Sequence, residues 1–256
     1  MHLETWQWLL GGLAALLVGI SKTGVPGIGI MVVPLLGAAF GGRLGAGVML
    51  PMLIMGDIFA VTWYRRHAQW DKLVGLLPWV AVGLALGTAA LKITGDSKSS
   101  RDLTGVVIGW IVMAMVAAHL LRTWLGDRLT PTSHIGMAST GTAAGFATMV
   151  SNAAGPVMQM YLAAHRLPKE QFMGTIAWYF FVINVSKFPV YVVLSGLIPA
   201  KPLVTGESLV FNAAVFPAIL IGVYSGKWLL PRIPQKAFES VIIALAAAGA
   251  AKLIVG

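Results

Sequence analysis

Apolar runs separated by short polar segments make up most of this chain. We place ten of them, at about 5–21, 27–41, 44–64, 73–93, 103–122, 135–150, 154–165, 171–198, 208–230 and 237–255. A helix needs about 20 residues to cross the hydrocarbon core of a bilayer. The third, fourth, fifth, eighth, ninth and tenth runs meet this length. The pattern therefore predicts an all-α integral membrane protein of about eight to ten transmembrane or half-membrane helices.

Polar breaks join the four shorter runs into two pairs. The first break is SKTGVPG at 21–27, and the second is SNAAGP at 151–156. Each pair forms either two thin spans or a helical hairpin whose tip lies within the membrane, and the short run 154–165 favours the hairpin. Broken helices at corresponding places in two halves of a membrane protein are typical of a transporter's binding site.

The two halves of the chain resemble each other. Residues 47–64 align without gaps on 174–191, which pairs Gly47 with Gly174, Asp57 with Asn184 and Tyr64 with Tyr191. Farther on, Pro78, Gly83 and Gly87 correspond to Pro217, Gly222 and Gly226. Because each half has five runs, an odd number, the second copy must cross the membrane in the opposite direction to the first. We expect inverted repeats at 1–128 and 129–256 in one membrane domain. The alternative is a chance match between segments rich in glycine and proline.

Composition and charge agree with a membrane environment. The chain is 57% hydrophobic and 11% charged, with a mean hydropathy of +0.82, whereas soluble domains are about a quarter charged. The net charge is +9, but the basic residues lie in short loops, so nucleic acid is not an expected partner. There are no cysteines, and no two of the five histidines have ligand spacing. We expect neither a metal nor a cofactor.

Loop charges predict the orientation. One side carries Arg65, Arg66, Lys72, Arg122, Arg128, Arg166, Lys169, Arg232 and Lys236. The other side carries Arg43, Lys92, Lys98, Arg101, Lys201 and Lys252. Because the more basic side faces the cytoplasm, both termini are expected outside it. The first run lacks a basic segment before it and a small-residue cleavage site, so we expect a retained helix rather than a signal peptide.

Lys22 is the first candidate for binding chemistry. It follows an apolar stretch of about 16 residues, and Gly24 and Gly27 then interrupt the helix. The start of the next helix offers free N–H groups and about half a positive charge. Together with the hydroxyls of Ser21 and Thr23, this predicts a site for sulfite, a sulfonate or a carboxylate. The alternative is that Lys22 is an orientation charge in a loop.

The second break offers a comparable set of groups. Ser151, Asn152 and Gly155 fall in it, and Pro156 suits the first turn of a helix. Asn152 is placed either to cap that helix or to offer its amide to a bound anion. The two roles are compatible.

Lys187 and Asn184 lie inside the eighth run, one turn apart. A lysine near the middle of a bilayer costs about 2.5–3.5 kcal/mol and normally faces the protein interior or a cavity. We predict that Lys187 and Asn184 contribute to anion binding. The alternative for Lys187 is snorkelling to the interface, about 10 residues away.

Asp57 is the one acidic residue deep in any of the runs. A carboxylate there is a candidate for proton coupling, or for pairing with Lys22 or Lys187. The structural alternative is a carboxylate bonded to backbone groups or to Arg65 and Arg66.

Several motifs together match one known family. They are GISKTGVPGIGI at 19–30 with Pro34, LP at 50–51 with GDIFAV at 56–61 and YRR at 64–66, NAAGP at 152–156 with Tyr161, and GTIAW at 174–178 with 184–187. The chain resembles the TauE/SafE sulfite exporter family, also called the 4-toluene sulfonate uptake permeases. In the second break it has Ala153 and Ala154 where that family often has paired glycines.

The resemblance implies an inverted-repeat transporter of the bacterial inner membrane that moves sulfite, organosulfonates or related small anions. Coupling to an ion gradient is implied as well, and the two breaks would then form a pocket used in alternating access. An anion channel is the alternative, but it would need a continuous polar path, and the apolar runs contain too few polar residues to form one. An intramembrane enzyme would need paired carboxylates, a histidine–carboxylate set or a metal cluster. None of these falls within the apolar runs, so we do not expect an enzyme.

Overall fold

The computed structural model describes residues 3–24, 28–97, 102–125, 134–165, 167–229, 251 and 254–255. Within these ranges all regular structure is helical and no strand occurs. The prediction of an all-α membrane protein is therefore confirmed.

The described helices follow the apolar runs closely. They are α1 (Thr5–Thr23), α2 (Gly29–Phe40), α3 (Gly42–Tyr64), the 3₁₀ turn η1 (Arg65–His67), α4 (Trp70–Val74), α5 (Leu77–Asp96), α6 (Leu103–Leu125), α7 (His134–Ser151), α8 (Gly155–Ala164), α9 (Lys169–Leu197) and α10 (Gly206–Leu229). The fourth run is divided between α4 and α5, and nearly all of the tenth run lies outside the described residues. Among the described helices, α3 with η1, α5, α9 and α10 are long and apolar enough to cross a membrane.

The short helices next to the two breaks cannot cross a bilayer alone. α2 has 12 residues and α8 has 10, which correspond to about 18 Å and about 15 Å of helix. The hydrocarbon core is about 30 Å thick. These lengths favour two helical hairpins, α1–α2 and α7–α8, over pairs of thin spans.

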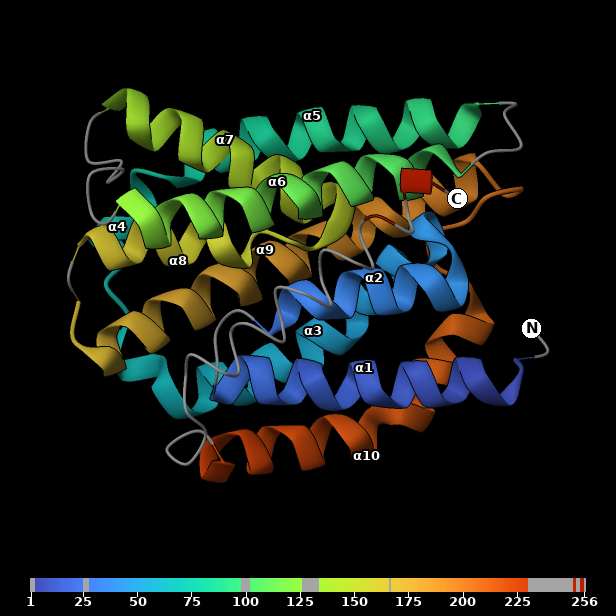
Figure 1. Cartoon of the computed structure of the whole chain (residues 1–256), viewed down its shortest axis with the longest axis horizontal. Coiled ribbons are helices and arrows are strands. Elements are labelled where there is room, and N and C mark those ends of the chain that lie inside the picture. The colour runs from blue at the N-terminus through green and yellow to red at the C-terminus, as the bar shows by residue number, and fades with distance from the viewer. Residues whose placement is uncertain are drawn as a thin grey trace.

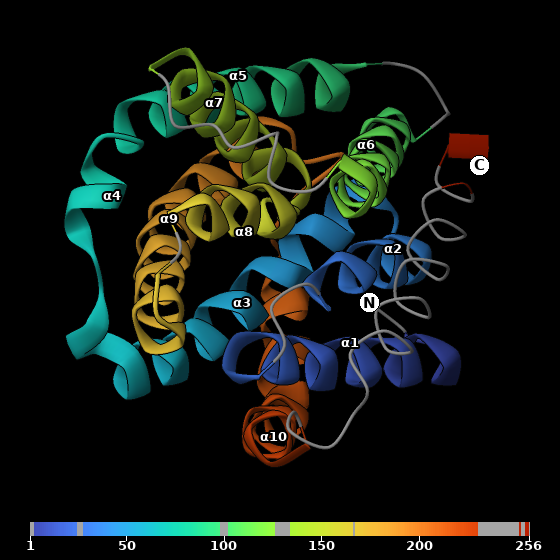
Figure 2. The ribbon, with the colours of Figure 1, turned by 60° about the vertical axis from the view of Figure 1, so that its left-hand side comes forward.

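The helices pack so that the outer pairs combine both halves of the chain. α5 and α7 lie together on one side of the molecule, and α1 and α10 lie together on the opposite side (Figures 1 and 2). α2, α3, α8 and α9 occupy the space between these pairs. α3 also packs along α9. The centre of the molecule is therefore built by α2 and α8, the short helices of the two hairpins, and by the two long helices α3 and α9.

Glycines allow the outer pairs to approach closely. A Cβ atom added at Gly19 of α1 would lie 2.6 Å from the backbone nitrogen of Val223 in α10. One added at Gly83 of α5 would lie 2.7 Å from the backbone nitrogen of Phe146 in α7. Small residues at such crossings let helix backbones come into direct contact in membranes.

Candidate functional site

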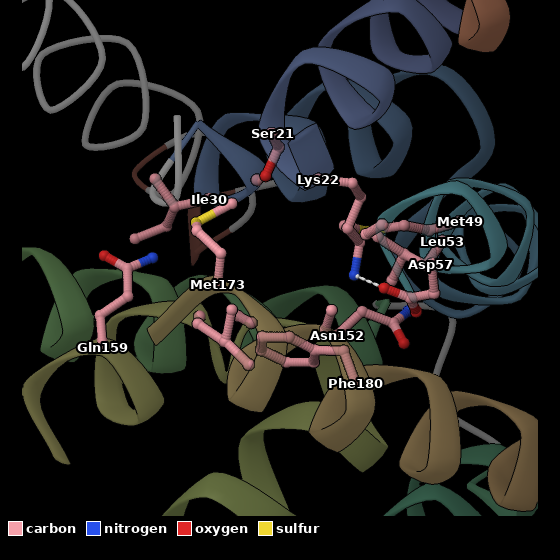
Figure 3. A pocket seen from close by; sticks show the side chains of 16 residues that line it. Ser21, Lys22, Ile30, Met49, Leu53, Asp57, Asn152, Gln159, Met173 and Phe180 are labelled. Carbon is pink, nitrogen blue, oxygen red and sulfur yellow. Dashed lines mark ion pairs between the residues drawn. The ribbon is translucent and has the colours of Figure 1, made fainter. Parts of the chain in front are cut away.

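A cavity of about 60 Å³ lies where the two breaks come together. The first break and the start of α2 line it with Ser21, Lys22, Gly29 and Ile30. The second break and α8 line it with Asn152, Ala153, Gly155 and Gln159. α3 and α9 supply the remaining walls, including Asp57 and Phe180 (Figure 3). A single water needs about 10–15 Å³ of such space, so this cavity has room for a few waters or one small anion.

Lys22 carries the positive charge of the cavity. Its Nζ lies 2.6 Å from Oδ1 of Asp57, and the two side chains are 10% and 0% exposed (Figure 3). The same ammonium lies 4.5 Å from the centre of the Phe180 ring. A cation over an aromatic face gains about 0.5–2 kcal/mol, depending on how much water is removed. Lys22 is thus held between a carboxylate and an aromatic ring.

Asp57 is paired on both of its oxygens. Lys22 lies at Oδ1, and the Asn184 amide donates a hydrogen bond of 2.7 Å to Oδ2. The carboxylate therefore pairs with Lys22, one of the alternatives that the sequence left open, rather than with Arg65 or Arg66. Asn184 does not line the cavity and acts on it through Asp57.

Two helices begin at the cavity wall. α2 begins at Gly29 and α8 at Gly155, and both of these residues line the space. The first turn of a helix has N–H groups without intrahelical partners and carries a partial positive charge. The wall thus combines an ammonium, a hydroxyl and two helix N-termini with one carboxylate.

Lys187 lies outside this cavity. It is 1% exposed, and its Nζ donates three hydrogen bonds: 2.8 Å to the carbonyl and 2.8 Å to the hydroxyl of Thr148, and 2.7 Å to Oδ1 of Asn152. An ammonium has three donors, so all of them are used at the end of α7. Here Lys187 satisfies the C-terminal groups of a helix and does not contact the cavity.

Asn152 ends α7 instead of capping α8. Its φ is 58°, in the left-handed (αL) region, and its N–H donates a 3.0 Å hydrogen bond to the carbonyl of Thr148. A residue with this conformation commonly ends a helix. Its side-chain amide donates a 2.9 Å hydrogen bond to the carbonyl of Ala46 in α3. Asn152 lines the cavity, but both ends of its amide already join α7 to α3 and α9.

The other predicted residues have packing contacts. The Thr23 hydroxyl lies 2.8 Å from the carbonyl of Val223, and a Cβ at Gly24 would lie 2.6 Å from the carbonyl of Gly226. Both therefore hold α1 against α10. Ser151 bonds back to Ala147 at 2.8 Å within α7. Gly27 lies outside the described residues.

Among the lining residues that the sequence analysis missed, Gln159 and Phe180 bring the most distinctive chemistry. Gln159 lies four residues after Gly155 on α8, and Phe180 lies four residues before Asn184 on α9. Residues four apart share one face of a helix, so this spacing was the available signal. Phe180 supplies the ring under Lys22, and Gln159 brings a polar group to the opposite wall (Figure 3).

Comparison with known proteins identifies the family. The model of the family described as sulfite exporter TauE/SafE matches residues 11–253. No curated protein and no solved structure gave a significant match. The matched region covers nearly the whole chain, which confirms the resemblance noted in the sequence. The chain belongs to the TauE/SafE sulfite exporter family and is a multi-pass membrane transporter of the sulfite and small-anion exporter type.

Proposed function

We propose that this protein is a proton-coupled secondary transporter that moves sulfite, an organosulfonate or a related small anion across the bacterial inner membrane by alternating access. One observation carries the proposal. The Lys22–Asp57 ion pair, 2.6 Å long, lies in a cavity lined by the starts of both α2 and α8.

The wall chemistry suits an oxyanion. Lys22 provides a full charge, Ser21 provides a hydroxyl, and the first residues of α2 and α8, Gly29 and Gly155, line the same space. In the structure Asp57 is the counter-ion of Lys22. A substrate anion takes over that role, because a buried ammonium without a partner is costly.

Asp57 links this exchange to a proton. When the carboxylate is protonated, Lys22 loses its counter-ion and becomes available to the anion. The Asn184 amide continues to hold the neutral acid, since a carboxylic acid keeps an accepting oxygen. Anion and proton then bind together, so a proton gradient drives the anion. A carboxylate within the membrane is the expected carrier for such a step.

We further propose that the two halves are inverted repeats, and matching contacts support this. Tyr64 donates to the carbonyl of Thr23 at 3.5 Å, and the aligned Tyr191 donates to the carbonyl of Met149 at 2.6 Å. Thr23 and Met149 lie at the ends of the first helix of each half, α1 and α7.

The glycine contacts have the same correspondence. Gly222 faces Gly19 and the carbonyl of Leu16, while the aligned Gly83 faces Gly145 and the carbonyl of Thr142. A chance alignment of glycine-rich segments gives no reason for equivalent partners, so these contacts favour the repeat.

In alternating access the moving units would be two helix pairs, each combining one helix from each half of the chain, rather than the two halves themselves. The α1–α10 and α5–α7 pairs are held by glycine contacts, with α3 and α9 between them. On the side of the cavity toward the start of α3, the Asn152 side chain joins the end of α7 to Ala46 of α3. Release of that contact, and of Lys187 from the end of α7, would open the cavity on this side while the α1–α2 hairpin closes the other.

Sulfite counterflow in proteoliposomes tests this function. Lys22→Gln removes the ammonium and should lower the exchange rate at subsaturating sulfite by at least about tenfold, the loss expected for one charge-assisted contact. Lys227→Gln is the matched control, because Lys227 also lies over an aromatic ring, that of Trp63 at 4.7 Å, and does not line the cavity. Flux that does not saturate, or equal rates in the two variants, contradicts the proposal.

A further inference from the structure

Gln159 is a polar side chain of the cavity wall that no step of the proposed transport uses. It lies on α8, and its amide has no hydrogen-bond partner among the described residues. The neighbouring polar groups are already committed. Tyr161 of α8 donates to the carbonyl of Lys72 at 2.8 Å, and the Asn152 amide joins α7 to α3 and α9. A polar group in an apolar interior is costly unless it is hydrogen-bonded, so Gln159 is available to a ligand.

The amide nitrogen of Gln159 faces the cavity. A Cβ atom added at Gly155, which also lines the space, would lie 3.7 Å from this nitrogen. Figure 3 shows the nitrogen on the side of the amide toward Ile30 and Met173. The side chain is half-buried, so the amide is not sealed within the protein. Gln159 therefore offers a hydrogen-bond donor to the cavity.

The charged groups lie at the other end of the cavity. Lys22 and Asp57 form their ion pair there, and Met173 and Ile30 lie between this pair and Gln159 (Figure 3). Of the described residues that line the cavity, Lys22 alone is basic. One negative group on a ligand therefore has a counter-charge at this end. A second full negative charge beside Gln159 would have none.

Apolar side chains line the space between the two ends. Met173, Ile176 and Phe180 of α9 are spaced three and four residues apart, so they form one face of that helix. Ile30 of α2 also lines the cavity. Ile30, Met173 and Ile176 are 8%, 6% and 7% exposed. Such a wall favours the carbon atoms of a ligand over a further hydrated group.

We infer that Gln159 is a substrate-binding residue that selects the substrate by its uncharged end. The substrate class is a short organosulfonate with one negative charge and, across a short carbon chain, a neutral oxygen such as a hydroxyl or a carbonyl. Lys22 and Ser21 bind the sulfonate oxygens. The carbon chain lies against Met173 and Ile176, and Gln159 donates a hydrogen bond to the neutral oxygen. This inference rests on the proposed function, because it takes the Lys22 end of the cavity as the anion site.

Binding of two matched ligands to the purified full chain tests this inference by calorimetry. 2-Hydroxyethanesulfonate and 1-propanesulfonate carry the same charged group and are similar in length, but one ends in a hydroxyl and the other in a methyl group. We expect the hydroxyl compound to bind the wild type at least about fivefold more tightly, the gain from one neutral hydrogen bond. Gln159→Leu should abolish this preference and retain binding of 1-propanesulfonate, which also shows that the variant is folded.

Gln171→Leu is the matched control. Gln171 lies on α9 and does not line the cavity, so this variant should keep the wild-type preference. Equal affinity of the wild type for the two sulfonates, or a preference that survives Gln159→Leu, overturns the inference. The proposed function still stands in that case if Lys22→Gln weakens binding of sulfite and of both sulfonates. A wild type that binds neither sulfite nor either sulfonate overturns both.

Discussion

Asn184 donates a hydrogen bond of 2.7 Å to Asp57, and these two residues occupy the same position in the aligned halves of the chain. Both side chains are fully buried. In an inverted repeat, equivalent residues meet at the axis that relates the halves. The contact is nevertheless unequal, because an amide cannot take up a proton and a carboxylate can. This pair therefore provides one proton-binding group, next to the Lys22 ammonium that lines the cavity.

Asp57→Asn should uncouple transport from the proton gradient. The variant keeps a side chain of the same shape but leaves Lys22 without its negative partner at any pH. We expect sulfite counterflow to persist with an affinity that no longer changes with pH. Accumulation driven by an imposed pH gradient should fall to the level of liposomes without protein, as measured by sulfite uptake.

Asp71→Asn is the control for this experiment. Asp71 is an exposed carboxylate, with a side chain 61% accessible and an ion pair of 2.8 Å to Lys72. It should retain wild-type accumulation. If Asp57→Asn still accumulates sulfite as the wild type does, another group carries the proton.

Lys187→Met should destabilise the protein more than it weakens anion binding. The change leaves the Thr148 carbonyl and the Asn152 amide oxygen without their buried donor, at about 1–3 kcal/mol for each unpaired group. We expect a clearly lower melting temperature in detergent, with the sulfite affinity of the folded fraction within about threefold of wild type. Lys92→Met, at an exposed position, should leave both unchanged. A variant of normal stability that has lost sulfite binding would return Lys187 to the substrate site.

Gly19→Ala should separate α1 from α10. The added methyl group would meet the backbone of α10, at 2.6 Å from the nitrogen of Val223, and overpacking of this kind costs about 1–3 kcal/mol. Gly12 lies on the same helix with open space around it, so Gly12→Ala should keep or slightly raise stability. Thermal unfolding of the two variants measures the difference. Equal melting temperatures would show that the glycine crossing does not hold these helices together.

The helices were largely predictable because lipid imposes a simple rule on sequence. A run of apolar residues has one stable form in a bilayer, the helix, and its length sets the span. The run at 208–230 became α10 (Gly206–Leu229), and the run at 135–150 became α7 (His134–Ser151). The breaks were predictable as well, since polar residues with glycine and proline end such helices.

The partners of individual charges were not predictable in the same way. Lys187 and Lys22 both looked like buried lysines near polar residues, and only tertiary packing gives one to Thr148 and the other to Asp57. Arg43 looked like a loop charge because it falls between the apolar runs 27–41 and 44–64. In the structure Gly41 alone, with a φ of 79°, separates α2 from α3, and this tight turn buries the start of α3. Such contacts depend on residues more than 30 positions away, which no local pattern encodes.

The pairing of α1 with α10 and of α5 with α7 has a consequence for how the protein is made. The ribosome delivers α1 to the membrane before α10 has been synthesised, so the glycine face at Gly19 lacks its helix partner until α10 is inserted. The glycine face at Gly83 of α5 likewise lacks its helix partner until α7 is inserted. The nascent first half is thus an unfinished intermediate whose exposed small-residue faces await their partners. The chain reaches its mature form only when late-inserted helices dock against the earliest ones.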